Sequence, residues 1–186
     1  MLIDTSYFVG ELNIPNKDKD AVSGLLDLFI DKYEKRFLEE LLGYELYMAF
    51  VAGLGAATPS DEWINLRDGV EYTDLSSRTR FYPGLISAVS GNAGLDVSPI
   101  ANYVYYWYIR NNHSQTAAMG EVKSQNENAV FHSPALKMTR AWNEMSAWVC
   151  ELKDYLDSNK SLYPQWEKQD AWKMLKGFRP INEFNI

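Results

Sequence analysis

Residues 100–110 read IANYVYYWYIR, and this stretch decides the fold. Bulky apolar and aromatic side chains occupy almost every position, so a helix formed here has no polar side. A helix that is apolar all round must be buried on several sides. Ser98-Pro99 directly precedes the stretch and supplies an N-cap, followed by a proline at the first helical position. We therefore predict a central helix over 100–110, covered by other helices.

Two longer helical patterns accompany this stretch. Apolar residues recur at steps of three and four from residue 21 to residue 42, and Gly43 follows in a position that suits the end of a helix. Ser133-Pro134 opens a second pattern, which continues at the same steps for about 24 residues. Such a helix is roughly 36 Å long. It would cross most of a compact domain of this size, whose radius of gyration is about 16 Å.

Shorter helices connect these elements. We predict a helix over 44–52, followed by the capping sequence TPSD at 58–61 and a two-turn helix that ends at Gly69. A last helix is predicted over 163–177, with a proline near its start and a glycine at its end.

Two internal segments lack a helical period. Residues 70–97 and 111–131 carry polar and turn-forming residues, which predicts loops or short hairpins. The first dozen residues form an extended or turn-like arm, and residues 178–186 form an extended tail because Pro180 prevents a helix there. The predicted fold is mainly α: a helical bundle over 1–177 with one long helix in its C-terminal half, an irregular or hairpin excursion, and extended terminal arms.

Composition limits the functions that the chain can have. The net charge of −7 argues against a general affinity for a nucleic-acid backbone. A single cysteine, Cys150, excludes an internal disulfide and a cysteine-rich zinc site, and its place beside an apolar stripe predicts a small packing residue. No apolar run reaches the roughly 18–20 residues that span a bilayer. The first residues lack the pattern of a signal peptide, so we expect a cytosolic protein without a membrane partner.

Motifs for catalysis are absent from the sequence. It contains no glycine-rich phosphate loop, no nucleophile elbow, and no zinc-protease or EF-hand pattern. His113 and His132 flank the second excursion and could converge with Glu121 or Glu127, because a histidine paired with carboxylates can act as a base or a metal ligand. We interpret both histidines as surface residues at helix ends. The prediction is no catalytic residue, no cofactor and no metal.

Aromatic residues are unusually frequent. They make up 14% of the chain and include 6 Trp and 12 Tyr, which is more than a small protein can hide easily. Large aromatic side chains fill protein cores, but they also anchor interfaces between proteins. The sequence leaves open which of them are core residues and which contact a partner.

Several stretches, taken in order, resemble a known family. They are YFVGEL at 7–12, LLGYELY at 41–47, WINL at 63–66 followed by Gly69, IANYVYY at 100–106, MGEVK at 119–123, ENA at 127–129, SPALKM at 133–138 and AWNEM at 141–145. Together they are similar to head–tail connector (adaptor) proteins of tailed bacteriophages, particularly those of crAss-like and related phages of Bacteroidetes. The likeness covers nearly the whole chain, and its motifs are structural rather than catalytic.

This resemblance implies a structural virion protein. Such subunits form a ring, typically twelve-fold, that docks under the portal, extends the DNA channel and offers an attachment surface to neck and tail proteins. Double-stranded DNA passes through without specific binding. The protein is expected at the head–tail junction of the virion, and in the host cytoplasm during assembly.

Apolar segments at the termini are the candidate contacts with a partner, because short apolar segments can order on a partner during assembly. We predict a protein interface that includes the following residues: Tyr7, Phe8, Trp172, Phe178, Arg179, Ile181, Phe184 and Ile186. Three alternatives remain open: another neck component such as a stopper or tail terminator, a small hydrolase that uses the histidines and carboxylates, and a host-directed binding module.

Overall fold

The structure is a computed structural model that describes residues 1–88, 96–112, 115–117, 120–122, 133–166, 173–174 and 176–182. Within these residues the helices are α1 (Asp20–Leu42), α2 (Tyr44–Leu54), α3 (Asp61–Asp68), α4 (Pro99–Asn112) and α5 (Ala135–Ser158), and two short 3₁₀ helices, η1 (Thr5–Tyr7) and η2 (Gly10–Leu12), precede them. The predicted mainly α fold is confirmed. The helix predicted over 163–177 does not begin at its predicted start, because residues 163–166 form a turn; residues 173–174 and 176–177 are helical, and residues 167–172 and 175 lie outside the described residues.

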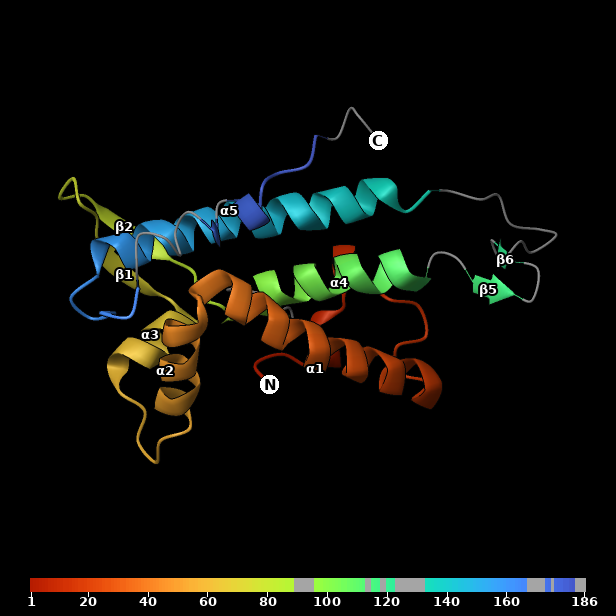
Figure 1. Ribbon diagram of the computed structural model, residues 1–186, viewed down its shortest axis with the longest axis horizontal. Coiled ribbons are helices and arrows are strands. Elements are labelled where there is room, and N and C mark those ends of the chain that lie inside the picture. The colour runs from red at the N-terminus through yellow and green to blue at the C-terminus, as the bar shows by residue number, and fades with distance from the viewer. Residues whose placement is uncertain are drawn as a thin grey trace.

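The central position predicted for the aromatic helix is confirmed. α4 lies between α1 and α5 and contacts both of them (Figure 1). Its buried residues are an unbroken run from Pro99 to Tyr105 together with Tyr108, as expected for a helix without a polar side. Ser98 caps it: the Ser98 hydroxyl accepts a hydrogen bond from the Ile100 N–H at 3.1 Å and donates one to the Leu85 carbonyl at 2.7 Å.

The two long helices begin and end close to their predicted bounds. α1 ends at Leu42 because Gly43 takes a φ of 75°, a conformation that disfavours other residues. α5 is 24 residues long and begins directly after Ser133-Pro134. The Ser133 hydroxyl accepts a hydrogen bond from the Ala135 N–H at 3.3 Å.

The two segments that lack a helical pattern, 70–97 and 111–131, contain short pairs of antiparallel strands. β1 (Val70–Thr73) pairs with β2 (Thr79–Tyr82), β3 (Ser87–Ala88) pairs with β4 (Asp96–Val97), and β5 (Gln115–Ala117) pairs with β6 (Gly120–Val122). In the first hairpin Val70 lies opposite Tyr82, and Thr73 lies opposite Thr79. Of the two open alternatives, loop or hairpin, the hairpin is therefore confirmed for the described parts of these regions.

The N-terminal arm packs against the bundle. The Glu34 carboxylate on α1 accepts hydrogen bonds from the N–H groups of Leu2 at 2.9 Å and Ile3 at 3.2 Å. Burial raises the pKa of the Glu34 carboxyl, and these two N–H groups oppose that shift. Phe8 in the same arm is fully buried in the core of the chain. This burial corrects the prediction that Phe8 contacts a partner.

The segment after Gly177 also belongs to the core at its beginning. Phe178 is buried, and its ring lies 5.2 Å from Phe37 and 6.0 Å from Tyr103. The Phe178 carbonyl accepts a hydrogen bond from the Ser146 hydroxyl on α5. The prediction that this residue starts a separate tail and contacts a partner is therefore wrong, because the local sequence does not reveal that α1, α4 and α5 leave a place for its ring.

Much of the aromatic surplus fills the core. Tyr103 contacts the rings of Tyr33, Phe37, Trp107, Trp142 and Phe178 at centroid distances between 5.1 and 6.2 Å. Burial raises the pKa of the Tyr103 hydroxyl to about 12. A second cluster stacks Tyr82 on Tyr155 at 4.6 Å. Aromatic pairs with ring centres at these distances stabilise a fold by more than the burial of their apolar area alone.

Candidate interaction sites

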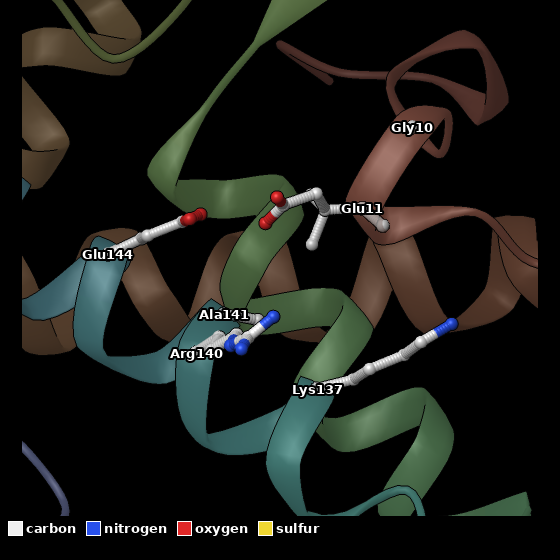
Figure 2. Close-up of a pocket in the computed structure, with 7 residues that line it drawn as sticks. Gly10, Glu11, Lys137, Arg140, Ala141 and Glu144 are labelled. Atoms are coloured by element: carbon white, nitrogen blue, oxygen red, sulfur yellow. The ribbon is translucent and has the colours of Figure 1, made fainter.

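A groove runs between the N-terminal arm and α5. It consists of two adjoining cavities of about 350 and 300 Å³, which share Gly10, Glu11, Leu12 and Glu144 as lining residues. The η2 turn forms one wall, and the exposed side of α5 forms the other (Figure 2). The groove continues past Asn102 on α4 to Trp148 on α5.

Four charged side chains line this groove. The carboxylates of Glu11 and Glu144 point toward each other across it, while Arg140 and Lys137 lie on the neighbouring turns of α5 (Figure 2). Among the described residues none of the four forms an ion pair. The Asn102 amide donates a hydrogen bond to the Glu144 carboxylate at 3.1 Å and holds it in place. The groove therefore presents charges of both signs that a partner could pair.

One predicted interface residue lines the groove. Tyr7 is partly buried beside Asp96 and Val97, and burial followed by the charge of Asp96 raises the pKa of its hydroxyl. Its neighbour Phe8 turns into the core instead. The arm therefore divides its two aromatic residues between the groove and the core.

The other predicted interface residues do not join Tyr7. Arg179 is exposed, and its carbonyl accepts a hydrogen bond from the Trp142 indole at 2.7 Å. Ile181 is partly buried, and its backbone N–H and carbonyl bond the Asn143 side chain at 2.7 and 3.0 Å. Trp142 lies on the opposite side of α5 from Glu144, because positions two residues apart diverge by about 200° around a helix, and Asn143 lies about 100° from Glu144.

The remaining members of that predicted interface cannot be placed. Trp172, Phe184 and Ile186 lie outside the described residues.

Two guanidinium groups converge on one tryptophan, a feature that sequence reasoning missed. The Arg36 and Arg110 side chains lie 5.3 and 5.2 Å from the centre of the Trp107 ring, and Lys32 lies 4.9 Å from the ring of Tyr33. Tyr33 stacks on Trp107 at 5.4 Å. The spacing of four between Lys32 and Arg36 could have placed them on one side of α1, but nothing local reveals that Trp107 lies opposite.

Large apolar side chains are exposed on two helices. On α1, Leu25 and Leu28 lie in line with Lys32 and Arg36 at steps of three and four, and these four residues are called the α1 face. The exposed residues of α2 recur at the same steps, and they are called the α2 face: Tyr44, Met48 and Val51. Leu28 is 68% exposed and Tyr44 is 66% exposed. Leu25 belongs to the apolar pattern over 21–42 that predicted a helix with one buried side, yet its side chain is exposed.

The structure does not test the alternative of a site built from histidines and carboxylates. His113, His132 and Glu127 lie outside the described residues, and Glu121 is described only as part of β6. No group of three or more metal-ligating side chains gathers in the part of the chain that the structure describes.

Cys150 is the only cysteine of the chain. It is exposed on α5, so the prediction of a small packing residue is wrong.

Comparison with protein-family models, with curated proteins and with solved structures finds no match to this chain. Within the described residues, none of the helices has the length and apolar character needed to cross a membrane.

Proposed function

We propose that this chain is a structural, non-enzymatic subunit of a phage head–tail connector. The subunit forms a twelve-fold ring that docks under the portal protein, extends the DNA channel and carries neck or tail proteins. It needs no cofactor for this function. Double-stranded DNA passes through the ring without specific binding, and the protein resides at the head–tail junction of the virion.

One observation carries this proposal: stretches that resemble connector proteins meet at the groove. The stretch 7–12 supplies the wall around η2, and 100–106 supplies Asn102. The stretches 133–138 and 141–145 supply the α5 wall with Lys137, Ala141 and Glu144. These segments are far apart in the sequence, so their meeting at one open, charged groove supports a shared use in docking.

The groove is suited to a protein segment. Its lining combines apolar residues such as Leu12 and Ala141 with carboxylates and cations that form no ion pair among the described residues. Charges of this kind govern which partner binds and how fast it binds, since complementary charges steer encounter and opposed charges exclude wrong partners. We therefore assign the groove as the docking site for the portal.

Charge reversal in the groove should weaken portal binding. We expect Glu11→Lys and Arg140→Glu each to reduce the affinity for purified portal protein roughly tenfold, or about 1.4 kcal/mol. Both side chains are exposed and make no ion pair among the described residues, so the Tm should stay unchanged. Lys19→Glu, an exposed charge reversal at the start of α1, is the matched control and should bind as the wild type does. Unchanged binding in both groove variants contradicts the docking site.

Copy number in virions tests the wider proposal. Quantitative peptide mass spectrometry of purified virions should find this chain and the portal in a ratio near one. Absence of the chain from virions overturns the proposal. A ratio near one half, or binding to a tail protein but not to the portal, would instead identify a different layer of the neck.

A further inference from the structure

We propose that the α1 face of one subunit packs against the α2 face of a second copy, which joins neighbouring subunits head to tail. The contact itself is argued from the two faces, and only the closed ring that it would form rests on the proposed function. It assigns a partner to surfaces that neither the groove nor the core uses.

Both faces have the apolar centre that a protein contact needs. Leu25 and Leu28 are exposed one turn apart on α1, and Tyr44, Met48 and Val51 are exposed over two turns of α2. Contiguous exposed apolar side chains on a helix, rimmed by charged residues, mark sites of protein contact. The core of the chain covers neither group.

Beyond its two leucines the α1 face is positive, whereas exposed Asp27 and Asp31 flank the leucines themselves. Lys32 and Arg36 continue the α1 face, and Arg110 joins them through the ring of Trp107. In the described chain, neither Lys32 nor Arg110 pairs with a carboxylate. Stacking on the aromatic rings holds these cations in place, which reduces the entropy lost when a partner pairs them.

Carboxylates lie beside Tyr44, at the start of the α2 face. Glu39 and Glu40 line a cavity of about 260 Å³ together with Tyr44 and Lys173. Glu45 follows Tyr44 directly, is exposed, and forms no ion pair among the described residues. The ion pairs of Glu39 and Glu40 within α1 are exposed pairs four residues apart, which are weak and can be exchanged for pairs with a neighbour. The apolar residues of the two faces thus match, and Lys32 or Arg110 of one copy can pair with Glu45 of the next.

The positions of the faces favour a head-to-tail contact. Leu28 lies about 21 Å along the axis of α1 from its last residue. After Gly43 the chain turns, and α2 leaves the end of α1 steeply (Figure 1). A contact between unlike faces leaves one face free on each outer subunit, so further copies add until the ring closes.

Aspartate substitutions on the two faces test this contact. Leu28→Asp disrupts the α1 face and Met48→Asp disrupts the α2 face, whereas Leu75→Asp alters a leucine that is still more accessible, 80% exposed at the β1–β2 turn. The masses of the assemblies are measured by native mass spectrometry, with and without purified portal as a template. Wild type and Leu75→Asp should form assemblies larger than a dimer, and each face variant should remain monomeric or add only single copies to the portal.

Mixing the two face variants gives the sharpest result. An equal mixture of Leu28→Asp and Met48→Asp retains one intact α1 face and one intact α2 face, so it should form a one-to-one heterodimer that grows no further. Face variants that assemble like the wild type overturn the contact, as does a wild type that stops at dimers or stays monomeric on the portal. Assembly through these faces without any portal binding would leave the contact intact and contradict the proposed function instead.

Discussion

Phe178→Ala should lower the free energy of unfolding by about 3–5 kcal/mol, the range for truncation of a large aromatic residue in a core. Its ring lies among Phe37, Tyr103 and Trp142, and its carbonyl accepts the Ser146 hydroxyl. Removing the ring leaves a cavity that these neighbours can fill only in part. Urea denaturation followed by circular dichroism measures the change.

An exposed phenylalanine provides the control for this experiment. Phe81 on β2 is 62% exposed, so Phe81→Ala should change the stability by no more than about 0.5 kcal/mol. Truncation after Gly177 should be at least as damaging as Phe178→Ala, because it also removes the acceptors of the Trp142 and Asn143 side chains. A truncated chain as stable as the wild type would show that this segment is a separate tail.

Gly84→Ala should destabilise the protein by roughly 3 kcal/mol, from backbone strain and displacement together. Gly84 has a φ of 85°, and a methyl group there would lie 2.5 Å from the backbone nitrogen of Gly69. The two segments must stay close, because the N–H groups of Leu85 and Ile86 both donate to the Arg67 carbonyl, at 2.7 and 2.9 Å. Thermal unfolding of the purified variant measures the loss.

A helical glycine gives the matched control. Gly24 lies on the exposed side of α1, and no atom lies within 4 Å of the place that a Cβ would take. Gly24→Ala should therefore stabilise the chain by about 0.5–1 kcal/mol, since alanine loses less conformational entropy in a helix. Equal stability of Gly84→Ala and wild type would mean that the two segments can separate at no cost.

Local signals in the sequence determined where the main helices begin and end. Gly43 can adopt the positive φ that ends α1, and Ser98 places its hydroxyl for the first turn of α4. The apolar character of 100–110 required burial on several sides, and α4 lies between α1 and α5. Each of these signals acts over a few residues, so sequence reasoning could find it.

The candidate sites depended on distant segments and could be predicted only in part. Tyr7 was predicted at an interface and lines the groove. The opposite wall of the groove comes from α5, which is more than a hundred residues away in the sequence. The convergence of Arg36 and Arg110 on Trp107 likewise joins α1 to α4. No spacing along the chain encodes such a meeting.

The sequence by itself determined the helical class, the central aromatic helix and the long helix α5. Only the tertiary structure decided which apolar residues are core: Phe8 and Phe178 are buried, whereas Leu25 and Leu28 remain exposed on a helix whose opposite side packs. The physical reason is that helix formation depends on neighbours within one or two turns. Burial depends instead on which distant segments occupy the space beside a side chain.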